Sequence, residues 1–333
     1  MPNPSSSIDW PRFTEIVRGH QRFLLTSHIR PDCDALGSEL GLAGVLQALG
    51  KNVLIVNGQA TPPNLRFIDP EKAIRAICSD IQPDQLADRE VLIILDTSAW
   101  AQLGPMGDVV KATRAKKLIL DHHVSSDDLE AEIFKNTKAE ATGRLVMEAA
   151  EQLGVALTPE IARPLFAAIA TDTGWYRFAS TSGDTYRRAG ELIDAGVRPD
   201  AIYNVLYEQD TLARLKLIGR ILAGAETELD GRLIYTCVLR EDFAAVGALP
   251  TDTEDIINLT LTVGGTQVAV IFVEQPAGGF KISFRSRSAV SCSKLAENFG
   301  GGGHHAAAGA FVNEPLAATK EKVLGAVRAA MAV

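Results

Sequence analysis

Cysteine is scarce in this chain, and its placement excludes one kind of metal site. Among the 333 residues there are four cysteines, and no two of them form a C-x-x-C pair. The sequence therefore excludes a zinc knuckle built on cysteine. The sparse thiols indicate a reducing, cytoplasmic setting.

Long apolar runs and a secretion signal are also missing. No apolar run approaches the roughly 20 residues that a membrane span requires, so we expect no membrane association. The segment 1–7 lacks a basic region followed by an apolar core, and we expect no secretory signal there. The hydrophobic fraction of 46% and the charged fraction of 22% are typical of a soluble globular protein.

The chain also lacks the excess of positive charge that broad binding of long nucleic acid requires. Its net charge is −8, which argues against a positive field over the whole surface. This balance is compatible with a small phosphorylated substrate held by a local cationic site. It is equally compatible with an acidic cluster whose charge is neutralised by bound metal.

The first half of the chain contains a repeated pattern, in which an apolar strand is followed by acidic or imidazole side chains. Such strands are predicted over 22–27, 91–95 and 117–120. Helical segments between them favour a parallel α/β sheet, whose ligand sites lie at the carboxyl ends of the strands. The side chains expected at that edge are His28, Asp32, Asp34, Asp96, Asp121, His122 and His123.

Asp32 and Asp34 are expected in a loop ahead of a helix over 39–50. In extended backbone, residues two apart project to the same side with Cα atoms roughly 7 Å apart. Each aspartate would then be able to hold its own cation. The alternative is an acidic turn that only caps the helix.

A buried helix over 159–171 delivers a further carboxylate, Asp172. With Asp32, Asp34 and Asp96, it would form a cluster that repels by roughly a few kcal/mol per close pair. Two divalent cations would cancel this charge, and imidazole with carboxylate favours manganese, iron, cobalt or zinc over magnesium or calcium. Two metals can lower the pKa of a bridging water and hold both oxygens of a phosphoryl displacement. Taken singly, each residue could be a cap or an ordinary loop residue; their recurrence favours a metal site.

The second half changes pattern and predicts a smaller α+β domain. Strands are expected over 233–239, 267–274 and 280–287, with a last strand beginning at Phe311. We therefore expect a parallel-sheet α/β domain with flanking helices over 1–185, a helical linker over 186–225, and the α+β domain over 226–333.

Four consecutive glycines, 300–303, precede His304 in this second domain. Glycine has no Cβ, so the backbone N–H groups of such a loop can approach an anionic ligand closely. Arg285 and Arg287 on the preceding strand supply guanidinium groups suited to phosphate. The alternatives are a flexible hinge for the glycines and a solvated strand edge for the arginines.

Together these residues resemble the DHH phosphoesterase superfamily and, within it, the group of nanoRNases and 3′-phosphoadenosine 5′-phosphate phosphatases. The resemblance spans nearly the whole chain and implies a DHH domain followed by a DHH-associated domain. The matching motifs are His28-x-x-x-Asp32-x-Asp34-x-x-Gly37-Ser38, Leu95-Asp96-Thr97, Asp121-His122-His123, Thr171-Asp172-Thr173-Gly174 and Phe299-Gly-Gly-Gly-Gly-His304-x-x-Ala-Ala-Gly309.

The resemblance implies two divalent metal ions, with manganese as the expected species. One ion would be held by His28, Asp32 and Asp96, and the other by Asp34, Asp96, His122 and Asp172. His123 would act on the scissile phosphate, and Asp121 would orient a ligand histidine from behind. The residues implied to bind the far end of the substrate are Arg285, Gly301, Gly302, Gly303 and His304.

We expect hydrolysis of short oligoribonucleotides, 3′-phosphoadenosine 5′-phosphate, or both, by two-metal activation of water. Alternatives are a cyclic di-AMP phosphodiesterase, an inorganic pyrophosphatase or a nucleotide-binding sensor. The second domain resembles the nucleotide-gripping kind, which disfavours pyrophosphate. The expected partners are short RNA or small phosphorylated nucleotides, and a homodimer is left open.

Two departures from the family pattern concern the rim of the site. Ala99 and Trp100 stand where many relatives carry another acidic residue. His305 follows His304 directly, so the choice between the two rings rests on motif alignment, which favours His304.

Overall fold

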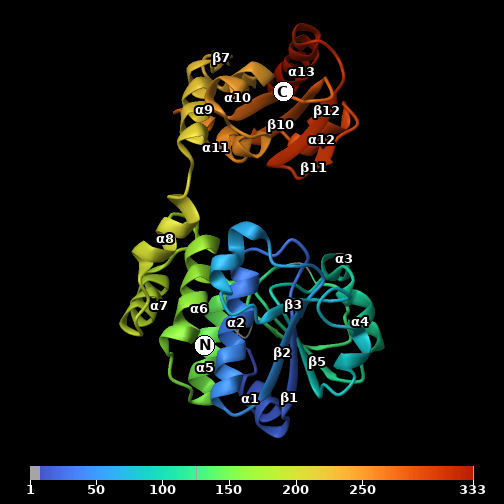
Figure 1. The fold of residues 1–333 in the computed structure, drawn as a ribbon, viewed down its shortest axis with the longest axis vertical. Coiled ribbons are helices and arrows are strands. Elements are labelled where there is room, and N and C mark those ends of the chain that lie inside the picture. Colours follow the sequence, from blue (N-terminus) through green and yellow to red (C-terminus); the bar gives the residue numbers. More distant parts are fainter. Residues whose placement is uncertain (1–7, 125, 333) are drawn as a thin grey trace. The chain divides into compact units, whose positions relative to one another are not determined.

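The computed structural model describes residues 8–124 and 126–332. The chain forms two compact units, Met1–Glu208 and Gln209–Val333. Each unit is built on a six-stranded sheet (Figure 1). The boundary between the units falls inside the segment 186–225 that was expected to be a linker.

The first sheet is entirely parallel, which confirms the predicted α/β class. Its strands run in the order β3-β2-β1-β4-β5-β6. The sequence did not predict β6, because only Phe134 among its residues is buried and no apolar run marks it. The strands are β1 (Arg22–Thr26), β2 (Asn52–Asn57), β3 (Ile74–Ala76), β4 (Val91–Leu95), β5 (Lys116–Asp121) and β6 (Glu132–Lys135).

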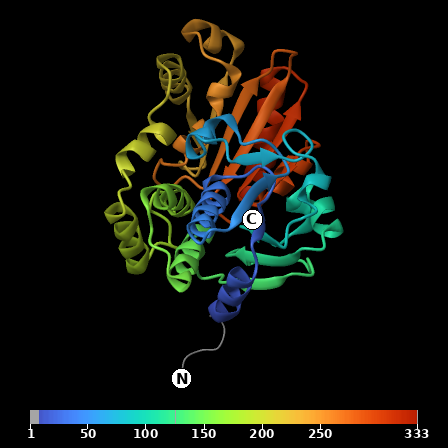
Figure 2. The same cartoon turned by 60° about the horizontal axis from the view of Figure 1, so that its bottom comes forward.

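Helices cover both faces of this sheet (Figure 1 and Figure 2). One core joins the sheet to α1 (Trp10–Gly19), α2 (Cys33–Ala48), α5 (Thr142–Leu153) and α6 (Pro159–Asp172). The core on the other face includes α3 (Trp100–Leu103) and α4 (Met106–Ala112). The unit also contains α7 (Gly183–Asp194), α8 (Pro199–Tyr207) and the short 3₁₀ helices η1 (Pro63–Ile68) and η2 (Pro83–Leu86).

The close packing of α2 against α6 depends on glycine. A Cβ at Gly37 would collide with the carbonyl oxygen of Pro164, and one at Gly41 would collide with the side chain of Leu165. Because the two helices touch, the start of α2 and the end of α6 come to the same edge of the sheet. That edge is where Asp34 and Asp172 are found.

The helix α2 begins earlier than predicted, and this corrects the expected conformation of Asp32 and Asp34. Asp32 is the N-cap, and its carboxylate accepts the N–H groups of Asp34 and Ala35, both at 3.0 Å. Asp34 therefore lies in the first helical turn and not in extended backbone. Since a carboxylate satisfies free N–H groups at a helix start, Asp32 caps α2, and it does so through Oδ1.

The second sheet is mixed, with strands in the order β11-β12-β10-β9-β8-β7. Only β8 and β9 pair in parallel; the other pairs are antiparallel. The last strand begins at Ala307 and not at Phe311, because alanine and glycine pair with β10 although they are weak strand formers. The strands are β7 (Glu226–Glu228), β8 (Leu233–Val238), β9 (Val268–Glu274), β10 (Phe280–Ser286), β11 (Gly302–Gly303) and β12 (Ala307–Val312).

Alternate residues of the central strands serve the two faces of the second sheet. Ile282 and Phe284 belong to a core with α12 (Cys292–Glu297) and α13 (Leu316–Met331). Ile271 and Val273 belong to a core with α9 (Leu212–Ala223) and α11 (Ile256–Thr260). The remaining helices are α10 (Arg240–Val246) and the 3₁₀ helix η3 (Pro250–Thr253). Over residues 8–124 and 126–332, no helix is both long enough and apolar enough to cross a membrane.

Candidate active site

The strand order places a ligand site at one position in the first sheet. Order reverses between β1 and β4, and open α/β sheets bind ligands at the carboxyl ends of the strands at such a reversal. His28 follows β1 and Asp96 follows β4. The first sheet therefore brings these two side chains to its switch point.

The acidic and imidazole residues expected at this edge do come together. Their ligand atoms form three overlapping groups, and within each group the atoms lie within 4.8 Å of one another. The groups are His28, Asp32 and Asp96; Asp34, His122 and Asp172; and Asp96, His122 and His123. Asp96 and His122 each belong to two groups, so these two residues link all three.

Asp34 is buried, and the N-terminus of α5 holds its carboxylate. The backbone N–H of Thr142 donates to Oδ2 at 2.7 Å, and that of Gly143 donates to Oδ1 at 2.8 Å. The Ser38 hydroxyl adds a third hydrogen bond at 3.2 Å. Because a helix N-terminus favours negative charge, α5 binds the Asp34 carboxylate and fixes its orientation. The spacing of Asp32 and Asp34 in the sequence did not predict this contact.

Asp96 occupies the centre of the cluster in a strained conformation. Its φ is +60°, a value that residues other than glycine seldom adopt outside functional sites. Oδ1 accepts the Thr142 hydroxyl at 2.9 Å, and Oδ2 lies 3.3 Å from Nε2 of His28. Nε2 of His122 lies 3.5 Å from Oδ1.

Backbone carbonyl groups orient the two histidines of the cluster. Nδ1 of His28 lies 3.0 Å from the carbonyl oxygen of Ile29, and Nδ1 of His122 lies 3.1 Å from that of Ala139. An Nδ1–H donor in each ring leaves the Nε2 lone pair directed into the cluster. This is the tautomer that a metal ligand requires.

Asp121 orients His123, the second of the two adjacent histidines. Its Oδ1 accepts Nδ1–H of His123 at 2.9 Å, and Oδ2 accepts the Ser98 hydroxyl at 2.8 Å and pairs with Lys135 at 3.0 Å. Burial alone would raise the Asp121 pKa, but the hydrogen bonds from His123, Ser98 and Lys135 outweigh it and lower the pKa to about 2. The same hydrogen bond raises the pKa of His123.

The charge balance of the cluster fits bound cations. Burial, followed by repulsion from Asp96, raises the pKa of Asp34; burial and then Asp32 raise that of Asp96. Burial also raises the pKa of Asp172. Divalent cations would reverse these shifts by supplying the missing positive charge. Imidazole nitrogen with carboxylate oxygen is a donor set for first-row transition metals.

In the second unit, the structure places Arg285 and His304 at the same end of the sheet. Arg285 pairs with Ala307 of β12, and the N–H of His304 donates to the carbonyl oxygen of Ala307 at 2.7 Å. The His304 side chain is exposed, while Arg285 is half-buried. Arg287 donates to the carbonyl oxygen of Leu261 at 2.9 Å, so that guanidinium already has a structural partner.

The glycine run is partly a strand, which corrects its interpretation as a loop. Gly302 and Gly303 form β11 against β12. A Cβ at Gly303 would lie 2.6 Å from the carbonyl oxygen of Ala307, and one at Gly301 would collide with that of Gly309. Neighbouring backbone thus explains both glycines. Gly302 has open space where its Cβ would be, so its backbone is the accessible one.

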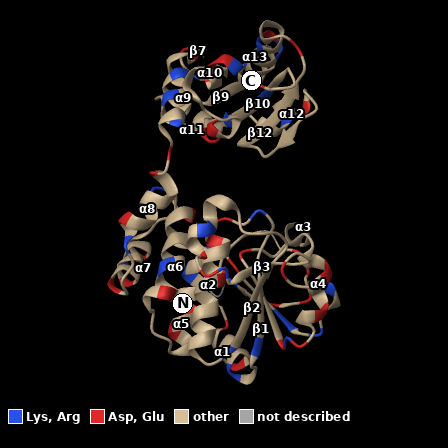
Figure 3. Cartoon of the chain, in the orientation of Figure 1, with Lys and Arg blue, Asp and Glu red and all other residues tan. Residues whose placement is uncertain are grey.

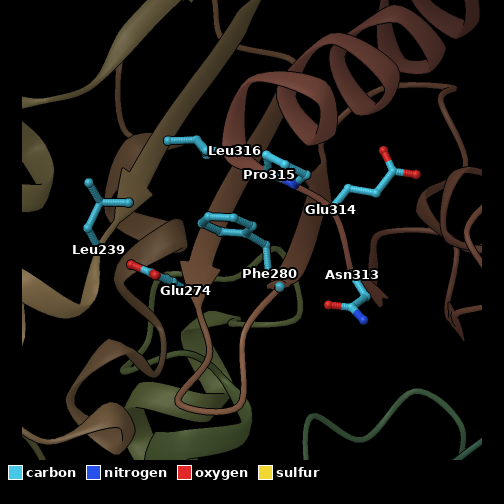
Figure 4. Close-up of a pocket in the computed structure, with 8 residues that line it drawn as sticks. Leu239, Glu274, Phe280, Asn313, Glu314, Pro315 and Leu316 are labelled. Carbon is cyan, nitrogen blue, oxygen red and sulfur yellow. The ribbon is translucent and has the colours of Figure 1, made fainter.

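One pocket in the second unit is lined by two acidic residues and is therefore unsuited to phosphate. It has a volume of about 550 Å³ and lies near Phe280, at the opposite end of β10 from Arg285. Figure 4 shows the Phe280 ring between Leu239 and Pro315, with Glu274 and Glu314 on either side. In Figure 3, acidic and basic residues are interspersed over the described parts of both units. Anion binding must therefore come from local arrangements of residues.

Family models match both units. A model described as the DHH family, N-terminal domain, matches residues 22–169, and a DHHA1 domain matches residues 234–332. A curated relative, the bifunctional oligoribonuclease and PAP phosphatase NrnA of Thermus thermophilus, is 34% identical over 307 residues. That alignment covers 91% of this chain and 88% of the relative.

Solved structures agree on the fold. An exopolyphosphatase-related protein from Bacteroides fragilis superposes with a TM-score of 0.82 and 25% identity, covering 96% of this chain and 94% of that one. RecJ from Thermus thermophilus in complex with Mn²⁺ superposes with a TM-score of 0.51 and 13% identity, covering 98% of this chain and 56% of that one. The chain belongs to the DHH family of phosphoesterases, with a DHH domain followed by a DHHA1 domain.

Proposed function

We propose that this protein hydrolyses phosphate esters of short oligoribonucleotides and of 3′-phosphoadenosine 5′-phosphate. The observation that carries the proposal is the set of three overlapping donor groups, linked through Asp96 and His122, at the switch point of the first sheet. The name of the Thermus relative, an oligoribonuclease and PAP phosphatase, supports this choice of substrates.

Two of the three donor groups have no residue in common, and we assign one cation to each: His28, Asp32 and Asp96 would hold one ion, and Asp34, His122 and Asp172 the other. Asp96, whose Oδ1 also lies 3.5 Å from Nε2 of His122, would bridge. When bound, such ions activate water and neutralise charge on the phosphoryl oxygens. We propose manganese, because the donors are imidazole and carboxylate and because the RecJ neighbour was solved with Mn²⁺.

His123 acts on the substrate and not on a metal. Asp121 holds its Nδ1, which leaves Nε2 of this half-exposed ring available to the phosphate. The hydrogen bond to Asp121 raises the pKa of His123 and so favours the protonated ring, which would stabilise the oxygens of the developing transition state. His123 is therefore the catalytic side chain of the proposal.

The second unit supplies binding. Arg285, His304 and the accessible backbone at Gly302 share one end of its sheet, where they would hold the far phosphate or base of the substrate. Gly301 and Gly303 would contribute only by shaping β11. We propose in addition that residues 186–225 link the two domains and that the protein acts in the cytoplasm.

One substrate panel tests the proposal. The purified chain with Mn²⁺ is assayed against a 5′-phosphorylated diribonucleotide, 3′-phosphoadenosine 5′-phosphate, cyclic di-AMP and pyrophosphate, with Asp96→Asn as the control for contaminating activity. We expect hydrolysis of the first two and none by the control. Turnover of only cyclic di-AMP or only pyrophosphate would overturn the substrate assignment. Binding without turnover of any of them would identify a sensor.

A further inference from the structure

The turn after Asp172 has an unusual backbone. Gly174, Trp175 and Tyr176 are consecutive residues with φ of +56°, +59° and +62°. Bulky side chains rarely adopt this left-handed conformation, and strain of this kind is concentrated at functional sites. Hydrogen bonds hold the turn, from the N–H of Trp175 to the carbonyl oxygen of Ala170 at 2.6 Å and from that of Tyr176 to Oγ1 of Thr173 at 3.1 Å.

The strained turn directs Trp175 onto α8, which lies beside α6 (Figure 1). The Trp175 ring centroid is 5.0 Å from that of Tyr203 and 5.6 Å from that of Tyr207, and the two tyrosines are 4.9 Å apart. Tyr203 is 38% exposed and Tyr207 is 49% exposed. We call these three residues the aromatic wall. Its tyrosines leave a large aromatic surface open to solvent.

The aromatic wall continues from the candidate metal site. A pocket of about 330 Å³ is lined by Asp32 and Asp172 on one side and by Leu206 of α8 on another. Leu206 shares a helix face with Tyr203 and neighbours Tyr207.

We propose that the aromatic wall stacks against the base of the nucleotide whose phosphate is cleaved, with this pocket receiving its sugar. The inference rests on the proposed function, because it assigns the base that is attached to the reacting phosphate. Stacking on aromatic rings tolerates any base, since every base has a π-face. The amide of Asn64, which also lines the pocket, can hydrogen-bond a sugar hydroxyl or a base edge.

A purely structural role would confine the wall to packing α8 against α6. Trp175 does contact Phe166 of α6, with centroids 6.1 Å apart. Packing alone needs no exposed tyrosine surface, however, and it makes no distinction between substrates with and without a base. That distinction separates the two roles by experiment.

The test compares two substrates on four proteins. The substrates are a 5′-phosphorylated diribonucleotide and the same compound lacking the base on the nucleoside next to the cleaved phosphate, both with Mn²⁺. The proteins are the wild type, Tyr207→Ala, Tyr207→Phe and Tyr186→Ala. Tyr186 is a matched control, because it is 59% exposed and stacks on Tyr176 instead of joining the wall.

We expect Tyr207→Ala to raise KM for the complete dinucleotide about tenfold, the size of one stacking contact, and to leave the abasic substrate unchanged. Tyr207→Phe and Tyr186→Ala should match the wild type on both, and thermal unfolding should show that all four are folded. Equal losses on both substrates, or none on either, would overturn the stacking proposal. Failure of the wild type to cleave either substrate would instead overturn the proposed function.

Discussion

The two units of this protein treat ionisable residues in opposite ways. Among the described residues, the buried carboxylates all belong to the first unit: Asp34, Glu39, Asp69, Asp96, Asp121 and Glu140. The buried polar side chains of the second unit are all hydroxyl-bearing: Thr236, Thr260, Thr266, Ser286 and Thr319. Arg285 and His304 remain at its surface or half-buried.

The difference indicates that the first unit gives up folding stability to bury charged groups, whereas the second unit does not. A buried carboxylate is costly unless it is hydrogen-bonded or paired with positive charge. In the first unit this cost is offset by the N-terminus of α5, by Lys135 and, in our proposal, by two metal ions. The second unit has an ordinary apolar core, and its hydrogen-bond donors, Arg285 and His304, lie at one end of its sheet. Its contribution to the reaction would therefore be binding energy.

The largest effect should come from Asp96, which belongs to two of the three donor groups. We expect Asp96→Ala to lower Mn²⁺-dependent hydrolysis at least ~10³-fold, since a metal site supplies several kcal/mol of transition-state stabilisation. The metal-free fold should not be weakened, because a buried carboxylate that its acidic neighbours repel is removed. Steady-state kinetics and thermal unfolding measure both. Asp108→Ala, an exposed aspartate on α4, is the control; near-normal turnover by Asp96→Ala would refute the assignment.

Glu39 tests whether burying charge costs the first unit stability. Its side chain is fully buried and accepts a hydrogen bond from Asn57 at 2.9 Å, and burial raises its pKa from 4.5 to about 7. The unfolded chain therefore releases this proton at lower pH than the folded one, so the free energy of unfolding falls as pH rises from 4.5 to 7. The difference amounts to about 3 kcal/mol.

Replacing Glu39 with glutamine should remove this pH dependence. We expect Glu39→Gln to be more stable than the wild type at pH 8 and no more stable at pH 4.5, as measured by urea unfolding of metal-free protein. Glu71→Gln, at an exposed position, is the control. Parallel pH profiles for the wild type and Glu39→Gln would contradict the assigned burial effect.

In the second unit, loss of Arg285 or His304 should affect affinity more than chemistry. A charge-assisted hydrogen bond is worth about 1.5–3 kcal/mol, so Arg285→Ala should raise KM for dinucleotides roughly 10- to 100-fold with little change in kcat. Lys294→Ala, an exposed cation on α12, serves as the charge-matched control. If Arg285→Ala and His304→Ala both kept wild-type KM, the second unit would have no role in substrate binding.

The glycines of β11 should show the smallest and most selective effects. Gly301→Ala would collide with the backbone of β12, so we expect it to lower the free energy of unfolding of the second unit by about 1–3 kcal/mol. Gly302→Ala meets open space and should change stability by less than about 0.5 kcal/mol, while weakening dinucleotide binding. Denaturant unfolding and KM measurements separate the two. Equal destabilisation by both would contradict the packing described for β11.

Sequence patterns predicted the parallel sheet and its acidic edge because buried strands appear as apolar runs. Val91–Leu95 was predicted with the bounds that β4 has, and the helix predicted over 159–171 ends one residue before α6 does. The same patterns missed β6, where a single buried phenylalanine leaves no run to detect. Hydrophobic periodicity and secondary-structure propensity therefore predicted the elements that are buried in the core, and they were least informative for edge strands.

Contacts between distant segments could not be predicted. The hydrogen bonds from the N–H groups of Thr142 and Gly143 to Asp34 join residues more than a hundred positions apart in the sequence, and no local pattern indicates them. The histidine that Asp121 orients could not be named in advance, because sequence order cannot decide which of two adjacent rings turns back toward it. The glycine run was predicted as an anion loop, whereas two of its members are glycine for the sake of the neighbouring strand.

The grip of α5 on Asp34 has a consequence for the choice of metal. Because two backbone amides and a hydroxyl already fix this carboxylate, its orientation does not depend on an incoming ion. Different divalent cations would meet nearly the same preformed cradle, with no induced reshaping to tell them apart. Selection among them would then fall to intrinsic ligand preference and to whichever ion the cell supplies in abundance.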